Sequence, residues 1–406
     1  MLQDRLAELS ARARFGMDLD LSRMRTALAE LSHPEEHLLA VHVAGSNGKG
    51  STCAMLESIA RSAGLSTGLY TSPHLSRFAE RVRLGGAPVA DDLFERCLAR
   101  ALTAASGSLT FFETLTATAF LAFREACVDL AIIEVGLGGR LDATNTLPAP
   151  LACAITSISL EHTSILGSTL DLIAREKAGI LKPGVPYVLG PLPLEAERAI
   201  ESVARDVSAG PRWPGALPPR PTALRGPHQR RNAALAAALA EMIAPRFPAA
   251  DLRAAIAPGL ASVAWPGRFE KLPAERGVTV LFDGAHNDEG TAALLEALKE
   301  DGISPERTTL VFGALADKSW EPMLRALVYT SSRHVYTSPK GRSPAPLEHL
   351  SRIAPGACEP DPARALRLAI ERTPDGGTVL VTGSLYLVGE LRAVFLGLAS
   401  DPVIAL

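Results

Sequence analysis

The sequence predicts an α/β fold in two parts, a mostly parallel sheet domain followed by a second, smaller α/β domain. Three observations lead to this prediction. A glycine-rich turn joins an apolar strand to a helix after residue 44, apolar strands alternate with helical stretches from about residue 38 to residue 190, and the alternation resumes after residue 267. With 406 residues, 47% of them hydrophobic, the chain is long enough to build two separate cores.

The predicted strands of the first part are apolar enough to be buried on both faces. Residues 38–44 are almost wholly apolar, and residues 128–135 and 151–158 form the next two clear strands, a pattern typical of parallel strands covered by helices. Residues 51–63 then show helical periodicity up to Gly64, a residue type that favours the end of a helix. The first strand and this helix therefore flank the glycine-rich turn.

The turn between them has the composition of a phosphate-binding loop. Gly45, Gly48 and Gly50 allow backbone N–H groups to converge at a helix N-terminus, where the helix dipole favours anions. Lys49 adds a positive charge for the β- and γ-phosphates, and the Ser51 hydroxyl can ligate Mg²⁺. The pattern indicates a P-loop-type domain that handles a nucleoside triphosphate. Because Gly50 separates Lys49 from Ser51, a chance glycine-rich turn stays open as the alternative.

A break in periodicity separates the two parts of the chain. The Pro-rich residues 211–227 indicate an irregular crossover before an Ala-rich helix at residues 232–243. Pro, Gly and Ser then cluster over residues 258–267, which predicts an interdomain linker. Beyond it, four strands separated by helical stretches predict the smaller domain, at residues 278–282, 308–312, 332–336 and 378–381.

Composition argues against several classes of protein. The net charge of -3 offers no attraction to nucleic acid or anionic membranes. The cysteines are odd in number and lack a C-x-x-C pair, as in a reduced cytosolic protein without structural zinc: Cys53, Cys97, Cys127, Cys153 and Cys358. The stretch MLQDRLAELSARAR has no apolar centre of a signal peptide, and no apolar run approaches the ~20 residues of a membrane helix. We therefore expect a cytoplasmic protein.

Titratable side chains gather where the predicted strands end. Glu134 follows an unbroken apolar run, and a carboxylate there is costly unless it meets a cation. We therefore expect Glu134 to be an Mg²⁺ ligand rather than a surface carboxylate at a sheet edge. His162 follows the strand at residues 151–158, from which it would reach the same crevice, although a lone His is usually structural. The glycine-rich residues 136–139 indicate a tight turn rather than a second nucleotide loop.

The motifs resemble those of the folylpolyglutamate synthases and the bifunctional dihydrofolate synthase/folylpolyglutamate synthases of the Mur ligase superfamily. The matching segments run in the family's order over nearly the whole chain: residues 42–51, 70–75, 80–83, 110–113, 134–145, 175–180, 267–268 and 283–287. The lysine spacing of the loop is the family's own variant. Two departures keep the needed groups, since Ser46 stands where the family often has Thr and Glu161 precedes His162 where Asp is common.

The resemblance implies an ATP-dependent ligase. In such enzymes ATP phosphorylates a substrate carboxylate, and the amine of glutamate attacks the acyl phosphate to form an amide. An attacking carboxylate must approach a triphosphate of the same sign, so cations are required between them. The resemblance accordingly implies ATP, two Mg²⁺ ions and a monovalent cation as cofactors.

The resemblance also assigns residues to the nucleotide and the metal. The segments that match the ATP site contain Asn47, Gly48, Lys49, Gly50, Ser51, Asn232 beside adenine, Arg268 reaching the phosphates and Asp283 at the ribose. The Mg²⁺ shell matches Ser51, Ser72, Glu134 and His162, and the catalytic set matches Lys49, His162, Lys177 and Arg268.

Lys177 has two interpretations. From composition alone, residues 174–178 form an ordinary helical face with a solvated lysine. The resemblance implies instead that Lys177 is carbamylated, which converts a cation into an anion able to hold a second Mg²⁺. A carbamate requires an unprotonated amine, and hence a buried lysine with a lowered pKa.

The folate site rests mainly on resemblance. Phe111 and Phe112 offer apolar faces for a flat pterin or p-aminobenzoyl ring, although both phenylalanines are equally suited to the core. The family's pteroate-contacting segments match residues that include Asp18, Thr110, Phe111, Phe112, Glu113, Leu141 and Asp142. Arg81 and Arg83 are candidates for binding acidic folate tails, with solvated surface as the default interpretation.

In the second part, two loops follow predicted strands as binding loops do. Lys318 is suited to pair with a glutamate carboxylate, and Ser384 is suited to donate a hydrogen bond to it. The resemblance implies an ATP-binding, Mur ligase central-type domain with the folate site at residues 1–262, a linker at 263–267, and a glutamate-binding, Rossmann-like domain at 268–406. We expect a monomer that acts on small molecules, folate or dihydropteroate and L-glutamate.

Three functions are open at this point. The first is the ATP-dependent folate:glutamate ligase, which extends tetrahydrofolate and also dihydropteroate. The second is a Mur-type ligase of cell-wall peptide precursors, against which the segments at residues 70–75 and 110–113 favour the folate branch. The third is a non-catalytic nucleotide switch, against which the second domain's own Asp-Gly-Ala-His-Asn and Asp-Lys segments argue.

Overall fold

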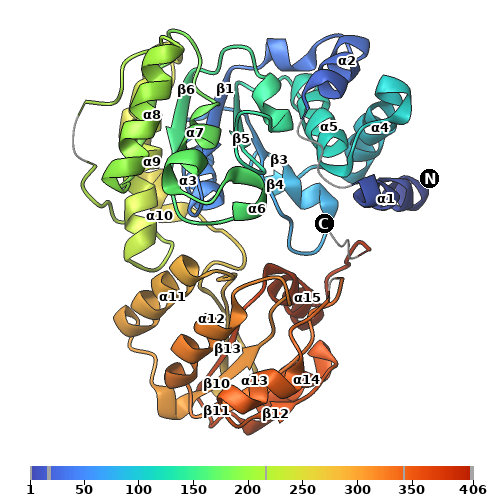
Figure 1. Cartoon of the computed structure of the whole chain (residues 1–406), viewed down its shortest axis with the longest axis vertical. Helices are drawn as coiled ribbons and strands as arrows, with labels where there is room; N and C mark the ends of the chain where they lie inside the picture. The colour runs from blue at the N-terminus through green and yellow to red at the C-terminus, as the bar shows by residue number, and fades with distance from the viewer. Residues whose placement is uncertain (1, 16–19, 215–216, 342, 403–406) are drawn as a thin grey trace. The chain divides into compact units, whose positions relative to one another are not determined.

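The chain folds into two compact units. A computed structural model describes residues 2–15, 20–214, 217–341 and 343–402. The first unit contains the residues up to His74, Phe78–Ala223 and Gln229–Ala264, and the second contains Leu75–Arg77, Leu224–His228 and the chain from Trp265 onward. Figure 1 colours the elements of both units along the chain. The sequence did not indicate that the two short segments, 75–77 and 224–228, group with the second unit.

The first unit is built on a seven-stranded sheet with the order β4-β3-β2-β5-β1-β6-β7. The strands are β1 Ala40–Ala44, β2 Thr67–Tyr70, β3 Val82–Leu84, β4 Ala87–Pro88, β5 Leu130–Glu134, β6 Ala152–Ile155 and β7 Tyr187–Leu189. β2, β5, β1, β6 and β7 run parallel, whereas β3 and β4 pair antiparallel at one edge. Every residue of the five parallel strands is buried, which confirms the predicted coverage of both faces.

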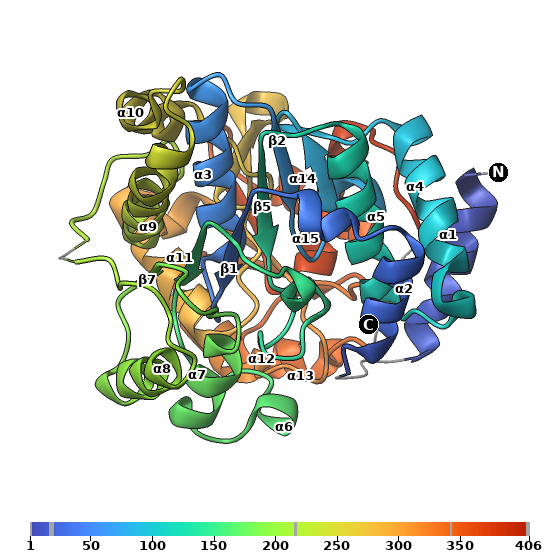
Figure 2. The same cartoon turned by 90° about the horizontal axis from the view of Figure 1, so that it is seen from above.

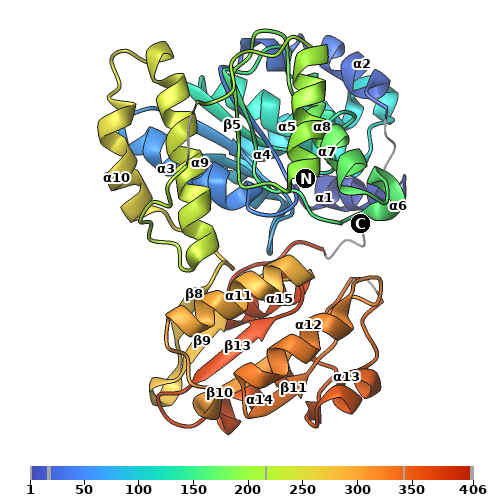
Figure 3. The same ribbon diagram turned by 60° about the vertical axis from the view of Figure 1, so that its left-hand side comes forward.

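Helices cover both faces of this sheet. They are α1 Leu2–Ala11, α2 Ser22–Glu30, α3 Lys49–Ser62, α4 Asp91–Thr103, α5 Phe111–Glu125, α6 Thr163–Leu166, α7 Leu170–Ala178, α8 Leu194–Asp206, α9 Pro227–Ile243 and α10 Leu252–Ser262. α3, α9 and α10 lie on one side, and α4, α5, α7 and α8 lie on the other (Figures 2 and 3). Burial of apolar side chains such as Ile173 and Ile200 against Ile155 holds α7 and α8 to the sheet.

The second unit has a six-stranded sheet with the order β12-β11-β10-β13-β9-β8. Its strands are β8 Glu270–Pro273, β9 Thr279–Phe282, β10 Thr308–Phe312, β11 Arg333–Tyr336, β12 Ala357–Cys358 and β13 Thr378–Thr382, all parallel except β8. One core packs α11 Asp288–Glu300, α12 Trp320–Leu327 and α13 Leu347–Ile353 on the sheet, and another packs α14 Pro362–Arg372 and α15 Leu385–Leu396. This arrangement is a doubly wound α/β unit.

The predicted elements are confirmed with one correction. The predicted strands and helices are present with shifts of a few residues at their ends, and the strand at 308–312 agrees to the residue. The linker predicted for residues 258–267 is wrong for its first half, because Pro258 to Ser262 lie within α10. A proline usually ends or kinks a helix, but tertiary packing can hold the turn that contains it. Here Gly259, the next residue, packs directly on α3. Among the described residues, none of the helices combines the length and apolarity needed to cross a lipid bilayer.

The contact between α10 and α3 gives a prediction for stability. A Cβ added to Gly259 would lie 2.5 Å from Ile59 Cα, so the two helix backbones would have to separate. We expect Gly259→Ala to lower the free energy of unfolding by about 1–3 kcal/mol, as overpacking does. The exposed Ala254→Leu on the same helix serves as the control and should change it by less than ~0.5 kcal/mol. Equal urea-unfolding midpoints for the two variants would contradict the prediction.

Candidate active site

The glycine-rich loop leaves β1 at Gly45 and enters α3 at Lys49. Gly48 caps the helix with a φ of 86°, a left-handed conformation that favours glycine. A Cβ on Gly48 would lie 2.5 Å from Asn232 Oδ1, and a Cβ on Gly45 would lie 1.9 Å from Thr156 Oγ1. Because the first turn of any helix leaves its N–H groups without helical acceptors, the start of α3 is suited to an anion.

Residues that follow β6 hold this loop in place. Ser46 N–H donates to Ser157 O at 2.8 Å, and Asn47 N–H donates to Ser157 Oγ at 2.9 Å. The Thr156 hydroxyl donates to Asn47 O at 2.6 Å. The sequence analysis missed these two residues, although two hydroxyl residues directly after a buried strand were a visible signal. They fix the loop through its backbone, so its shape does not depend on a ligand.

Two ammonium groups share one carbonyl oxygen of the loop. Lys49 Nζ donates to Gly45 O at 2.7 Å and to Ser46 O at 2.9 Å. Lys177 Nζ donates to the same Gly45 O at 3.0 Å and to Glu161 Oε1 at 2.8 Å. Lys177 is only 2% exposed, so the interpretation of a solvated lysine is wrong. The structure thus brings Lys49 and Lys177 together, with Glu161 as the neighbouring anion.

Burial and neighbouring charges set the protonation of this cluster. Burial lowers the pKa of Lys177, and the Lys49 charge lowers it further, to about 8, against the opposing effect of Glu161. Burial raises the pKa of Glu161, but the charges of Lys49 and Lys177 overcome this effect and lower it to about 2. Glu161 is therefore an anion at neutral pH. At neutral pH a larger fraction of Lys177 is unprotonated than of an ordinary lysine, and the unprotonated amine is the form that a carbamate requires.

The predicted Mg²⁺ ligands lie at the carboxyl edge of the sheet. Glu134 ends β5 beside Val43 of β1, is 4% exposed, and accepts a hydrogen bond from Ser72 N–H at 3.1 Å. Ser51 is buried in the first turn of α3. Carboxylate and hydroxyl oxygens are ligand types that suit Mg²⁺.

His162 differs from the other predicted ligands. It is exposed and precedes α6 with a φ of 47°. Among the described residues, one group of three His, Cys or carboxylate side chains lies close enough to share an ion, and it consists of His33, Glu35 and Glu36. Glu134 and His162 do not form such a group, so their common role as ligands stays a prediction.

The predicted nucleotide contacts outside the loop lie on separate elements. Asn232, on α9, lies against Gly48, and its amide donates to Gln229 Oε1 at 3.1 Å. In the second unit, the Asp283 carboxylate accepts hydrogen bonds from the N–H groups of Phe269 and Ala285, both at 3.0 Å. Burial raises the pKa of Asp283, whereas the charge of Arg268 opposes the shift. The charge of Arg268 therefore acts on the Asp283 carboxylate.

The residues predicted for folate differ in burial. Phe111 is 1% exposed and packs edge to face on Phe78, so the core interpretation is right for it. Phe112 is partly exposed, and its ring covers Gly136, where a Cβ would lie 2.4 Å from Cζ. Phe112 is therefore the aromatic face that a ligand can reach. Leu141 is half-buried, and Asp18 lies outside the described residues.

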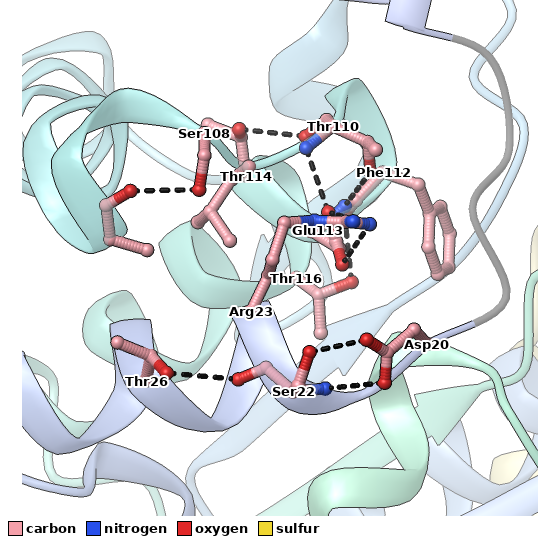
Figure 4. Close-up of polar contacts among 12 residues, drawn as sticks. Asp20, Ser22, Arg23, Thr26, Ser108, Thr110, Phe112, Glu113, Thr114 and Thr116 are labelled. Carbon is pink, nitrogen blue, oxygen red and sulfur yellow. Dashed lines mark hydrogen bonds and ion pairs between the residues drawn. The ribbon is translucent and has the colours of Figure 1, made fainter.

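Thr110 and Glu113 form a capping box at the start of α5. Thr110 N–H donates to Glu113 Oε2 at 2.7 Å, and Glu113 N–H donates to Thr110 Oγ1 at 3.4 Å. Arg23 of α2, which the sequence analysis missed, donates to Glu113 Oε1 at 3.2 Å (Figure 4). The Glu113 carboxylate thereby ties α2 to the end of α5 where Phe112 lies.

Asp142 is buried among donors of its own loop. Its Oδ2 accepts hydrogen bonds from the N–H groups of Gly136 at 3.0 Å and Leu137 at 2.9 Å. Its Oδ1 accepts from Thr144 N–H at 3.0 Å and from the Thr144 hydroxyl at 2.5 Å. Burial raises the pKa of Asp142, and these four donors oppose the shift. The carboxylate therefore holds the loop at residues 136–142 in shape.

Two arginines, which were predicted to bind folate tails or to lie on a solvated surface, make internal contacts. Arg81 is buried, donates to His74 Nδ1 at 2.9 Å, and lies over the Phe111 ring at 5.1 Å from its centroid. Arg83 donates to Gly86 O, and burial lowers its pKa while Glu57 opposes the shift. The interpretation of a solvated surface is therefore wrong, and a role in binding folate tails stays a prediction.

The residues predicted for glutamate lie at one edge of the second sheet. β10 and β13 are parallel neighbours in which Phe312 pairs with Thr382, so the loops after them lie side by side. Lys318 is half-buried in the first loop. Ser384 is buried in the second, where its hydroxyl accepts from Tyr386 N–H at 3.2 Å and caps α15.

Comparisons with known proteins relate the chain to amide ligases. A family of Mur ligase glutamate ligase domains matches residues 267–385. The dihydrofolate synthase/folylpolyglutamate synthase of Bacillus subtilis (strain 168) is 35% identical over 425 residues, which span 96% of this chain and 98% of that protein. The protein of the same name from Escherichia coli (strain K12) is 34% identical over 405 residues, 93% of this chain and 92% of that protein.

Solved structures agree with these relatives. E. coli FolC in complex with DHPP and ADP has a TM-score of 0.85 at 32% identity and covers 98% of each chain. The bifunctional folylpolyglutamate synthase/dihydrofolate synthase of Yersinia pestis, complexed with AMPPNP and a Mn ion, has a TM-score of 0.84 at 30% identity and covers 97% of this chain and 98% of that one. The similarity thus extends over both units.

The buried ion pair gives a prediction that depends on pH. Glu161→Gln removes the anion beside two ammonium groups, and breaking a buried pair costs about 3 kcal/mol of unfolding free energy. Since the folded-state pKa of Lys177 is depressed to about 8, Lys177 loses its proton as the pH rises above that value. We therefore expect the loss of stability in Glu161→Gln to be largest well below pH 8 and to shrink as the pH rises through about 8, where Lys177 becomes neutral in the wild type as well. Urea unfolding at pH 7 and pH 9.5 measures it.

Asp171→Asn is the matched control for this prediction. Asp171 pairs with Arg175 at 2.9 Å on the exposed face of α7, the helix that also contains Lys177. Exposed pairs contribute less than about 1 kcal/mol, so the control should show a small loss at both pH values. A Glu161→Gln loss that equals the control, or that grows with pH, would contradict the arrangement.

Proposed function

Since the chain belongs to the dihydrofolate synthase/folylpolyglutamate synthase family of the Mur ligase superfamily, whose members are ligases that form C–N bonds, we propose that it adds L-glutamate to a folate, with ATP as phosphoryl donor and an acyl phosphate as intermediate. We propose tetrahydrofolates as substrates and dihydropteroate as a second acceptor. The cell-wall peptide ligase is not favoured, because relatives that span nearly the whole chain are named for folate.

The convergence of Lys49 and Lys177 on Gly45 O is the observation that supports this reaction most directly. A carboxylate that attacks a triphosphate is repelled unless positive charge stands between them. Lys49 supplies such charge at the N-terminus of α3, and the buried Lys177 beside it is placed to hold, as a carbamate, a metal ion that would supply more. The preformed loop would lose little entropy when it binds the nucleotide.

We assign the proposed roles as follows. Lys49 and the first N–H groups of α3 bind the triphosphate, with Asn47, Gly48, Gly50 and Ser51 in the loop, Asn232 beside adenine, Arg268 at the phosphates and Asp283 at the ribose. Ser51, Ser72, Glu134 and His162 would hold Mg²⁺, and Lys177 as a carbamate would hold a second ion. When bound, these ions neutralise charge on the phosphates and the substrate carboxylate.

The substrates are assigned to loops at the strand ends. The folate ring would lie on Phe112, bordered by Asp18, Thr110, Glu113, Leu141 and Asp142, with Phe111 behind it in the core. Lys318 would pair with a carboxylate of glutamate, and Ser384 would orient it. In this scheme residues 1–262 bind ATP and folate, residues 263–267 are the linker, and residues 268–406 bind glutamate. A monovalent cation, a monomeric state and a cytoplasmic location complete the proposal.

One assay with a panel of acceptors tests this function. Phosphate release is measured with ATP, Mg²⁺ and L-glutamate, and with dihydropteroate, a tetrahydrofolate or a muramyl peptide as acceptor. We expect release with the two pteroyl compounds only when both glutamate and acceptor are present. Release with the muramyl peptide alone would replace the folate function with the cell-wall function, and release independent of every acceptor would indicate a nucleotide switch.

We expect Lys49→Ala to lower the rate of ligation by at least ~10², because it removes a charge that contacts the transferring phosphoryl group. Steady-state phosphate release with a saturating folate measures this loss. Lys299→Ala, at the exposed end of α11, is the control and should keep full activity. Near wild-type turnover in Lys49→Ala would remove the phosphate-loop assignment.

We expect Lys177→Ala to be nearly inactive and to recover part of its activity in acetate or formate. A short carboxylate can occupy the space that the proposed carbamate would fill, and can supply the anion that a second metal ion needs. Lys49→Ala serves as the control, because the same carboxylates should not rescue a missing cation. Full activity of Lys177→Ala without additive, or equal rescue of both variants, would rule out the carbamate.

A further inference from the structure

His42 is a buried titratable residue to which the proposed reaction gives no role. It lies in the middle of β1, fully buried, between Ile133 of β5 and Cys153 of β6. Its Nε2 lies 2.8 Å from Thr144 Oγ1, and its Nδ1 has no hydrogen-bond partner among the residues that the structure describes. Nearly all buried polar atoms are paired, so an unpaired ring nitrogen requires an explanation. An apolar side chain would fill the same space without this cost.

The hydrogen bonds around Thr144 fix the protonation of the ring. Burial raises the pKa of Asp142, but its two oxygens accept three backbone N–H groups, and these donors favour the ionised, acceptor-only form. The Thr144 hydroxyl, 2.5 Å from Asp142 Oδ1, therefore donates to the carboxylate and must accept from His42 Nε2–H. Burial, with the charge of Lys182, lowers the pKa of His42 to about 3, in agreement with a neutral ring. The one proton of the ring is thus committed to Thr144, which leaves Nδ1 bare.

The chain of bonds connects two functional segments. His42 belongs to the strand that ends in the phosphate loop, whereas Asp142 closes the loop that begins at Gly136. The ring of Phe112 covers Gly136, so the position of that loop sets the distance between the aromatic face and the carboxylate. A rotation of Asp142 would release both N–H groups that it holds at residues 136 and 137.

We propose that His42 is a positioning residue for the folate substrate: through Thr144 it orients Asp142, and thereby fixes the loop at residues 136–142 against Phe112. This proposal rests on the proposed function for the identity of the substrate. The structural part, control of the loop by the His42–Thr144–Asp142 chain, can be measured independently of any activity.

The test compares four single variants and one double variant, His42→Leu with Thr144→Val. His42→Leu and Thr144→Val each break the chain, whereas His42→Gln keeps an amide N–H at a similar reach. Ser58→Ala is the matched control, because it removes another buried hydrogen bond of the first unit, from Ser58 Oγ to Gly259 O at 2.7 Å. We expect KM for the folate substrate to rise at least ~5-fold in His42→Leu and Thr144→Val, with KM for ATP within ~2-fold of wild type. His42→Gln should restore most of the affinity, and the double variant should be no worse than the worse single variant.

Hydrogen exchange of the amides at residues 135–147, followed by mass spectrometry, supplies the second measurement. Exchange should be faster in His42→Leu and Thr144→Val, and unchanged in His42→Gln and Ser58→Ala. Unchanged exchange in His42→Leu would overturn the proposal whatever the activity, as would a rise in KM for folate that Ser58→Ala shares. If exchange is faster in His42→Leu but the wild-type protein ligates no folate, the proposed function is refuted and the positioning role of the chain stands.

Discussion

The ammonium groups of Lys49 and Lys177 both donate to the carbonyl oxygen of Gly45, and much of the first unit is arranged around the charge that they concentrate. Like charges at such short range repel strongly away from bulk water. Glu161 reduces this repulsion from one side, at 2.8 Å from Lys177. Because Glu161 follows β6 and Lys177 belongs to α7, the cluster requires those segments to be held against the end of β1. The apolar core under α7 and α8 supplies that support.

The register of the sheet explains why so many polar groups meet at one place. Val43 pairs with Glu134, and Ala44 pairs with Ile155, so β1, β5 and β6 end at the same level. In an open parallel sheet, the loops after neighbouring strands define the crevice where ligands bind. The second unit repeats this arrangement, since Asp283 and the loops containing Lys318 and Ser384 follow adjacent parallel strands. Each unit thus places its chemistry at the carboxyl edge of its own sheet.

The sequence predicted the buried strands and the loop well, because an unbroken apolar run has one stable environment in a globular protein. The run at 38–44 began two residues early, since Leu38 and Leu39 are apolar without belonging to β1. The edge strand β8 was missed because its residues alternate between partial and full exposure and include Lys271 and Pro273. Such a strand depends on its neighbour for hydrogen bonds and has little apolar signal of its own.

Parts of the candidate site depended on contacts that no local pattern reveals. The period of α7 could not distinguish a solvated Lys177 from a buried one, because burial depends on where β1 and the loop after β6 lie. For the same reason Phe111 and Phe112 looked equivalent, although one packs in the core and the other covers Gly136. Arg81 and Arg83 show the same limit, since cations in a sequence suggest a solvated surface, whereas these two side chains contact internal groups.

The buried polar side chains of the first unit form connected chains of hydrogen bonds rather than isolated contacts. A buried network is stable only when each member is satisfied, so a change at one end alters the geometry at the other. In the first unit, one chain runs from Lys49 through Gly45 to Lys177 and Glu161, and another runs from His42 through Thr144 to Asp142. Both chains start on β1 or directly after it. A single strand therefore supports both the proposed phosphate site and the proposed folate site. A reaction between a phosphate and a carboxylate requires such a fixed geometry between the two groups.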